Sequence, residues 1–199
     1  ELLKNIAKTK KPVILSTGLG NFEEIEESVN VLKNNGSDNI AVLHCISGYP
    51  TPTEDLNLAT IKDLRDKLNL ITGFSDHTKG INASVAATAY GAKIIEKHLI
   101  DTHETDSADK EFSINPSQLQ NLSSTISEFW ESHGEPNYEI KSSEKQNLRF
   151  RRSLYFNKDL KVGKKISKDD ISRVRPGHGL EIKYLDEIIG LELNQENVQ

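Results

Sequence analysis

The sequence predicts an α/β protein built on a parallel sheet. From Lys11 onward, short apolar segments alternate with segments whose apolar residues recur at helical spacing. This pattern fits an open doubly wound sheet or a (β/α)8 barrel, and the lack of a glycine-rich nucleotide-binding loop favours the barrel. The sequence holds about four of the eight units of such a barrel, so we predict half a barrel.

The first two predicted units carry clear local signals. A strand at residues 12–18 precedes a helix that begins near Asn21, which can cap the helix while Glu24 completes a capping box. Gly36 follows the helix and ends it. A second strand spans residues 40–45, and a loop rich in proline, SGYPTPTED, comes after it.

The next two units supply the third and fourth strands. An amphipathic helix with Ile61, Leu64 and Leu68 on one face precedes the third strand, at residues 70–75. A segment of small residues that can pack close to a sheet then leads to the fourth strand, at residues 93–100.

A change in composition divides the chain into two modules. The last helix of the first module begins at Pro116, behind Asn115 as its cap, and the barrel part is predicted to cover residues 1–131. Residues 132–148 are polar, contain proline, glycine and serine, and are interpreted as a linker. Residues 149–199 consist of short apolar segments between charged turns, which predicts a small, mostly β domain.

Composition argues against several classes of partner. The formal net charge of -5, with only short basic stretches, gives no electrostatic footprint for nucleic acid, and no apolar run reaches membrane-spanning length. The single cysteine, Cys45, excludes an internal disulfide and fits a reducing compartment, so a cytoplasmic location is expected. We expect the chain to be part of a longer protein, so the lack of a signal peptide does not bear on location.

Two histidines, His77 and His98, stand at the ends of the third and fourth predicted strands. Because side chains alternate along a strand, Ser75 shares a face with His77, and Glu96 shares one with His98. Together these groups favour a metal site over the alternative, in which each histidine is a hydrogen-bonded structural residue. His44, by contrast, is expected to be a packed structural residue. The remaining histidines fall in predicted loops or in the linker and are expected to be solvated: His103, His133 and His178.

Five motifs follow one another along the chain: ILSTG at 14–18, LHCISGYPTP at 43–52, FSDHT at 74–78, GAKIIEKH at 91–98 and RPGHGL at 175–180. Their order and spacing, over about residues 11–190, resemble the sialic acid synthase family. Members of that family condense phosphoenolpyruvate with an N-acylated amino sugar to give nonulosonic acids. The segments RFRRSLYF and RPGHGLEIKYLDEIIG are more similar to pseudaminic acid synthases than to N-acetylneuraminate or legionaminic acid synthases, although DSADKEFS matches neither pattern.

The resemblance implies a TIM (β/α)8 barrel followed by a small antifreeze-like domain, called the SAF domain. It further implies a homodimer whose SAF domains are swapped between subunits. The earlier barrel strands would then be missing from residues 1–199, so we expect these residues alone to lack synthase activity.

The resemblance also implies roles for individual residues. His77 and His98 match the two protein ligands of a divalent cation, usually Mn²⁺, with Mg²⁺ or Co²⁺ as substitutes, and Glu96 matches an acidic residue near the reacting carbon of the sugar. Three hydroxyls match contacts to phosphoenolpyruvate, namely Ser16, Ser47 and Ser75, with Ser47 standing where the family commonly carries asparagine. Three residues match contacts to the sugar, namely Tyr49, Asp109 and, from the neighbouring subunit, Arg175.

The chemistry of this reaction gives these groups a purpose. A cation held by two imidazoles keeps positions free to polarise the aldehyde of the sugar, and Glu96 is the candidate that manages protons when water adds. The alternative for Glu96 is a role in orienting the metal site. Tyr49 is otherwise a brace for its loop, and Arg175 a surface ion-pair residue. Two other functions stay open: a related metal-dependent barrel aldolase or synthase, and a non-catalytic carbohydrate-binding or scaffolding module.

Overall fold

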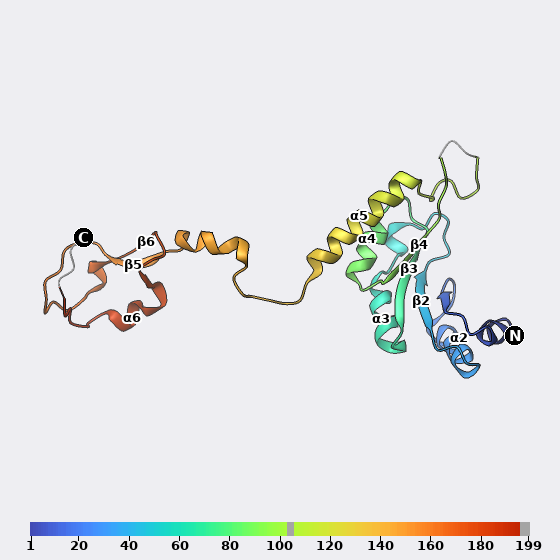
Figure 1. Ribbon diagram of the computed structural model, residues 1–199, viewed down its shortest axis with the longest axis horizontal. Helices are drawn as coiled ribbons and strands as arrows, with labels where there is room; N and C mark the ends of the chain where they lie inside the picture. The colour runs from blue at the N-terminus through green and yellow to red at the C-terminus, as the bar shows by residue number, and fades with distance from the viewer. Residues whose placement is uncertain (103–105, 196–199) are drawn as a thin grey trace. The chain divides into compact units, whose positions relative to one another are not determined.

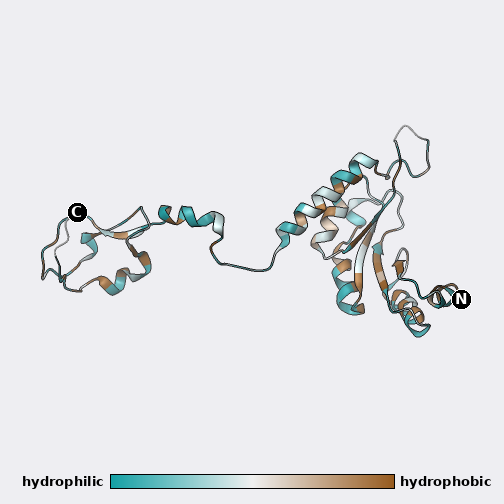
Figure 2. Ribbon diagram, viewed as in Figure 1, coloured by the Kyte–Doolittle hydropathy of each residue, from teal (hydrophilic) through white to brown (hydrophobic). Residues whose placement is uncertain are grey.

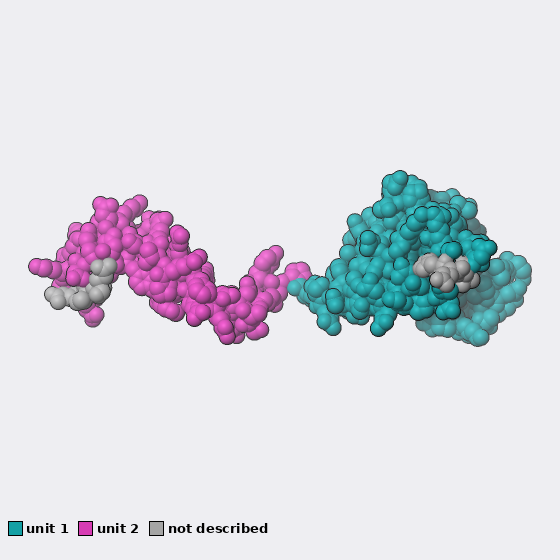
Figure 3. All heavy atoms as spheres, turned by 90° about the horizontal axis from the view of Figure 1, so that it is seen from above, with its two compact units in different colours: residues 1–135 teal, residues 136–199 magenta. Residues whose placement is uncertain are grey.

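The computed structural model describes residues 1–102 and 106–195. The chain divides into two compact units, Glu1–Glu135 and Pro136–Gln199 (Figure 3). Within the described ranges, no helix combines the length and the apolar character needed to cross a bilayer.

The first unit contains a four-stranded, fully parallel sheet, which confirms the predicted α/β class (Figure 1). Its strands are adjacent in sequence order: β1 (Val13–Ser16), β2 (Ile40–Cys45), β3 (Ile71–Asp76) and β4 (Ile94–Lys97). Neighbouring parallel strands in sequence order are the arrangement found around a (β/α)8 barrel, and four of them make half of one.

The strand ends differ in part from the prediction. β2 has the predicted bounds, whereas β1 and β4 are shorter than residues 12–18 and 93–100. Beyond β4, only an isolated bridge between Leu99 and Ile114 continues the pairing. His98 therefore lies just after the strand, because the pairing of β4 with β3 ends at Asp76 and Lys97, the last residues of the two strands.

The described residues of this unit also form five α-helices (Figure 1). Four of them follow the strands or the segments after them, and the first one precedes β1. They are α1 (Leu2–Lys8), α2 (Phe22–Asn34), α3 (Ala59–Leu68), α4 (Asn82–Ala89) and α5 (Pro116–His133), with a short 3-10 helix η1 (Thr53–Asp55) before α3.

The predicted helix caps are confirmed. At the start of α2, the Asn21 side chain accepts from the Glu24 backbone N–H at 2.9 Å, while the Glu24 carboxylate accepts from the Asn21 N–H at 3.0 Å. At the start of α5, Asn115 and Gln118 form the same reciprocal pair, each at 2.9 Å. Both boxes satisfy N–H groups that a helix end leaves unpaired, so the local sequence fixes where these helices begin.

The strands of the sheet contain both apolar and polar residues (Figure 2), and alternation along each strand places them on different faces. One face packs on the helices: Val42 of β2 shares an apolar cluster with Leu64 of α3, and Phe74 of β3 shares another with Ala87 of α4. Because successive side chains alternate, Ser75 points to the other face. The face away from the helices thus carries Ser75 near the carboxyl end of β3.

The second unit is a small antiparallel sheet in the order β6-β5-β7, in agreement with the predicted mostly β domain. Its strands are β5 (Ser153–Phe156), β6 (Ile171–Val174) and β7 (Leu180–Glu181). The short helices of this unit are η2 (Ser142–Phe150), η3 (Lys168–Asp170), η4 (Ile182–Tyr184) and α6 (Leu185–Ile188). η2 occupies part of the segment interpreted as a linker, and its residues are exposed.

A fully buried carboxylate, that of Asp170, ties the turns of the second unit together. Its Oδ1 lies 2.8 Å from the Lys158 ammonium and 2.6 Å from the Lys164 ammonium. Its Oδ2 accepts from the Ser167 backbone N–H at 2.9 Å and from the Ser167 hydroxyl at 2.7 Å. The two lysines first, and then Ser167, hold the pKa of the Asp170 carboxyl far below its ordinary value.

We expect Asp170→Asn to lower the melting temperature of the second unit at neutral pH, because the partly exposed Lys158 and Lys164 ammonium groups lose the buried carboxylate that they both contact. The pKa of the Asp170 carboxyl is lower in the folded than in the unfolded unit, so its ionisation stabilises the fold at pH values above the unfolded pKa of about 3.9. This stabilisation is lost as the pH falls below that value. Calorimetry should therefore show a difference in melting temperature between the wild type and the variant that is constant above about pH 5 and becomes smaller as the pH falls below about 4. Asp169→Asn, at the exposed neighbouring residue, is the control, and a gap of equal size at all pH values would contradict the assignment.

Candidate active site

The site is organised by the pairing of β3 with β4. Ser75 and Glu96 are register partners on these strands, and the Ser75 hydroxyl donates to Glu96 Oε1 at 2.7 Å. Ser75 is buried and Glu96 is exposed. The hydroxyl and the carboxylate predicted from strand parity thus meet on the face of the sheet away from the helices.

His77 and His98 follow these two strands directly, and the structure brings them together. Their ring centroids lie 5.3 Å apart with an angle of 68° between the ring planes. His77 is buried and the His98 side chain is 36% exposed. The predicted meeting of two imidazoles at one edge of the sheet is confirmed, although their role as metal ligands stays a prediction.

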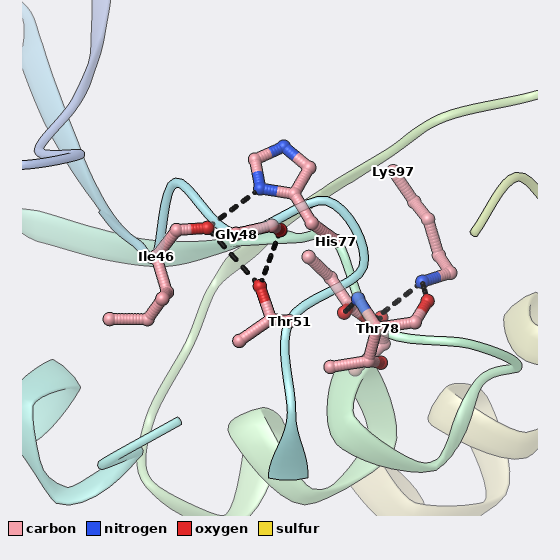
Figure 4. A network of polar contacts seen from close by, with 8 residues as sticks. Ile46, Gly48, Thr51, His77, Thr78 and Lys97 are labelled. Atoms are coloured by element: carbon pink, nitrogen blue, oxygen red, sulfur yellow. Dashed lines mark hydrogen bonds and ion pairs between the residues drawn. The ribbon is translucent and has the colours of Figure 1, made fainter. Parts of the chain in front are cut away.

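Each imidazole has a partner at Nδ1. His77 Nδ1 lies 2.9 Å from the Ile46 carbonyl oxygen (Figure 4), and His98 Nδ1 lies 3.2 Å from Asp109 Oδ2. A carbonyl oxygen only accepts, so we assign the hydrogen of His77 to Nδ1, and the same assignment suits His98 beside a carboxylate. In this tautomer Nε2 of both rings keeps its lone pair, which is the state a metal ligand requires.

The loop after β2 holds His77 in place (Figure 4). The Thr51 hydroxyl donates to the carbonyl oxygens of Gly48 and Ile46, at 2.8 and 3.2 Å, and the Thr51 N–H donates to the His77 carbonyl at 3.0 Å. The carbonyl that orients the His77 ring is therefore fixed by the same loop that binds the His77 backbone.

The donor set fits a cation that takes most of its ligands from water or substrate. Ring centroids 5.3 Å apart are within the range that two imidazoles on one ion span, since metal–imidazole bonds are about 2.1 Å long. In the part of the chain that the structure describes, no group of three or more His, Cys, Asp and Glu residues is placed to hold a metal. Two imidazoles with oxygen ligands suit Mn²⁺ or a similar divalent ion better than a closed structural zinc site.

Two aromatic rings line the histidine pair. The Tyr49 ring lies 4.3 Å from the His77 ring, and the Phe112 ring lies 4.9 Å from the His98 ring and 5.5 Å from Tyr49. Tyr49 is 56% exposed, which leaves its phenol at the rim of the site. Phe112 is buried and was not predicted, since it reaches the site through the loop whose Ile114 N–H donates to the His98 carbonyl at 2.9 Å.

The other two predicted serines lie at the same edge of the sheet. Ser16 ends β1 and is exposed, on the face that also carries Ser75. Ser47 follows β2, and its hydroxyl oxygen occupies space that a side chain at Gly18 would need. Gly18 thus allows the loop after β2 to approach the end of β1. The contacts of these serines with phosphoenolpyruvate stay predictions.

Asp109 and Arg175 were both predicted to contact a sugar. The structure places the Asp109 carboxylate beside His98, where it orients the ring, and a sugar contact stays a prediction. Arg175 is an exposed residue of the second unit, just after β6, where it lines a cavity with Tyr155 and Pro176.

The structural role predicted for His44 is confirmed. Its Nε2 lies 2.7 Å from the Leu56 carbonyl oxygen, and burial lowers the pKa of the His44 imidazole, with the Leu56 carbonyl opposing this shift. His133 is exposed as expected, yet it is the last residue of α5 rather than part of a loop. His178 is exposed in the second unit, and His103 lies outside the described residues.

A buried ion pair behind the histidines was missed by sequence reasoning. Lys97 Nζ lies 3.1 Å from Asp76 Oδ2, and the two side chains are 3% and 0% exposed. Burial lowers the pKa of the Lys97 ammonium, and the Asp76 carboxylate opposes this shift. The available signal was a charged residue at the last position of each of two strands, directly before a histidine.

These features define a protein of the (β/α)8 barrel type, with paired histidines at the carboxyl edge of its strands and a separate small β unit. Comparison with protein families places the chain more closely. Residues 1–138 match the NeuB family and residues 151–196 match the SAF domain. The chain belongs to the NeuB family.

Three relatives show the breadth of that family. An uncharacterized protein of Methanocaldococcus jannaschii is 41% identical over 98% of this chain and 58% of its own length. The N,N'-diacetyllegionaminic acid synthase of Campylobacter jejuni is 39% identical over 94% of this chain and 57% of its own length. The pseudaminic acid synthase of the same species is 35% identical over 96% of this chain and 56% of its own length.

A solved structure supports the fold. The crystal structure of N-acetylneuraminic acid (sialic acid) synthetase from Leptospira borgpetersenii, in complex with citrate, matches with a TM-score of 0.68 and 35% identity. The match covers 75% of this chain and 52% of that one. The chain thus spans a little over half the length of the relatives it matches.

We expect Phe112→Ala to lower the free energy of unfolding by about 3 kcal/mol, because it removes a buried ring and leaves a cavity beside His98. Urea denaturation measures this loss. Phe112→Leu, the control that keeps most of the apolar volume, should cost about 1 kcal/mol. Equal denaturation midpoints for the alanine variant and the wild type would show that the ring does not pack in the site.

Proposed function

We propose that this chain is part of a nonulosonic acid synthase, which condenses phosphoenolpyruvate with an N-acylated amino sugar to give a nine-carbon acid and phosphate. One observation carries the proposal: in a chain of the NeuB family, two imidazoles that are held through Nδ1 lie 5.3 Å apart and follow the strands that carry the Ser75–Glu96 pair. Relatives named as legionaminic, pseudaminic and N-acetylneuraminic acid synthases support it.

Pseudaminic acid synthase is the branch that the sequence motifs favour, and we keep it as the specific proposal. The identities to the two Campylobacter enzymes, 39% for the legionaminic branch and 35% for the pseudaminic branch, do not separate the alternatives. Phosphoenolpyruvate contributes three carbons to a nine-carbon acid, so each candidate acceptor is a six-carbon amino sugar.

The reaction needs an activated aldehyde and a nucleophilic carbon held near it. A divalent cation on His77 and His98, which we propose to be Mn²⁺ with Mg²⁺ or Co²⁺ as substitutes, would supply Lewis-acid polarisation of the aldehyde oxygen. The Ile46 carbonyl and Asp109 hold the two rings in the tautomer that such a role requires. Phe112 and Tyr49 shield one side of the pair from water.

Glu96 is the group that we propose to move protons. Its carboxylate is exposed on the reacting face, where it can serve the sugar oxygen or the water that adds to the second carbon of the former enol ester. The hydrogen bond from Ser75 fixes Oε1 and leaves Oε2 for that exchange. Loss of phosphate from the resulting adduct completes the reaction.

The remaining predicted residues complete the proposed substrate site. Ser16, Ser47 and Ser75 offer hydroxyls at one edge of the sheet for phosphoenolpyruvate. Tyr49, on the rim, is proposed to contact the sugar. Asp109 and Arg175 are proposed to join it, with Arg175 supplied by the SAF domain of the second subunit in a swapped homodimer.

The first test uses the protein expressed from its complete reading frame, assayed for phosphate release with phosphoenolpyruvate and a panel of six-carbon N-acylated amino sugars. Chelation should abolish turnover, and added Mn²⁺ should restore it. His77→Ala and His98→Ala should each lower turnover by at least about 100-fold, because the stabilisation that the ion supplies amounts to several kcal/mol. His133→Ala, on the exposed end of α5, is the control.

Turnover that survives both chelation and the two histidine substitutions would refute the metal-dependent proposal. Sugar binding without turnover, unchanged by the same substitutions, would instead support a carbohydrate-binding module. Turnover with a different acceptor class would support a related barrel synthase or aldolase.

Glu96→Gln tests the proton-transfer role against the metal-orienting role. As a general acid or base, Glu96 should contribute about 10²- to 10⁴-fold to kcat, while Mn²⁺ affinity in the variant stays within about twofold of the wild type. If Glu96 instead orients the site, Mn²⁺ affinity should fall by about 10- to 100-fold and excess Mn²⁺ should rescue turnover. Glu128→Gln, at an exposed position of α5, is the control.

A further inference from the structure

The buried ion pair between Asp76 and Lys97 lies directly behind the histidines. These residues end β3 and β4, are register partners, and each precedes a histidine in the chain. Because side chains alternate along a strand, the pair occupies the helix-covered face, opposite to Ser75 and Glu96. No residue of the pair is therefore in position to touch a substrate.

Two bonds of this pair lead to Thr78, the residue after His77, and a third leads to α4. Asp76 Oδ1 accepts from the Thr78 N–H at 2.7 Å, which closes a turn around His77. Lys97 Nζ donates to the Thr78 carbonyl at 2.7 Å (Figure 4). Asp76 Oδ2 accepts from the hydroxyl of Ser84, a buried residue of α4, at 2.5 Å.

The consequence is a cross-link between the two histidine-bearing segments. Lys97, which precedes His98, donates to the carbonyl of Thr78, which follows His77. Asp76, which precedes His77, accepts from the N–H of the same Thr78. A change in the distance between the ends of β3 and β4 would break one of these hydrogen bonds. Because the pair is buried, water would not replace the lost bond.

We propose that Asp76 and Lys97 are positioning residues that set the separation of His77 and His98 for joint binding of one cation. The inference rests on the proposed function, because it assumes that the two histidines share a metal. Stability alone does not require such a pair, since well-packed apolar residues often replace a buried ion pair without loss. Hydrogen bonds of the ion pair have a defined direction and length, whereas contacts between apolar side chains do not.

The test compares Mn²⁺ affinity with fold stability in the protein from the complete reading frame. Lys97→Met and the double variant Asp76→Leu with Lys97→Met are titrated with Mn²⁺, and the free ion is followed by electron paramagnetic resonance. Melting temperatures are measured without metal. Lys79→Met, the same change at an exposed lysine next to Thr78, is the matched control.

The expected result separates the two readouts. Lys97→Met should lower both the melting temperature and the Mn²⁺ affinity, because it leaves a buried carboxylate without its counter-charge. The double variant should recover the melting temperature while its Mn²⁺ affinity stays about 10- to 100-fold below that of the wild type, the usual cost of losing support behind a metal ligand. Lys79→Met should change neither.

A double variant with both native melting and native Mn²⁺ affinity would overturn the positioning role and leave the metal site standing. Should the double variant not fold, Ser84→Ala decides, since it keeps both charges and removes only the hydroxyl that anchors Asp76. A Ser84→Ala affinity lowered by threefold or more supports the proposal, and one within twofold of the wild type overturns it. A wild type that binds no Mn²⁺ would refute the metal site itself, and this inference with it.

Discussion

The in-register pairing of β3 with β4 is the constraint on which the rest of the site depends. It sets Ser75 beside Glu96 on one face and Asp76 beside Lys97 on the other. A slip of one residue in either strand would exchange the faces of that strand, burying a carboxylate without its ammonium and separating the hydroxyl from Glu96. The hydrogen bond on one face and the ion pair on the other therefore select the same register.

Loops, rather than strands, set the direction of the two imidazoles. The Nδ1 partner of His77 is a carbonyl in the loop after β2, whereas that of His98 is a carboxylate in the segment before α5. These loops come from different parts of the chain and meet only in the folded unit. The strands thus supply proximity, and the loops supply the tautomer and the orientation that a shared ligand needs.

Sequence patterns predicted what local or repetitive interactions determine. The caps predicted at Asn21 and Asn115 depend on residues close in the sequence, and the meeting of the histidines follows from the common direction of parallel strands. The contact of Phe112 with the histidines depends on the path of a loop, and the pairing of Asp76 with Lys97 depends on strand register. Neither leaves a repeating pattern in the sequence from which it could be predicted. The length of β4 was overestimated for the same reason, because its pairing ends at Lys97, opposite the last residue of β3.

Both units contain a buried carboxylate held by lysine, but the surroundings differ. Asp170 takes two ammonium groups and Ser167, all within a local turn region, so its contacts consolidate that turn. The Asp76–Lys97 pair instead joins residues from two strands and α4, and both of its members bind the backbone of Thr78. Exposed ion pairs of the first unit, such as Lys62 with Asp66, contribute little to stability because water screens them. The Asp76–Lys97 pair is buried, so water does not screen it, and it is bonded to the turn that carries His77. Its main effect is therefore on the position of that turn.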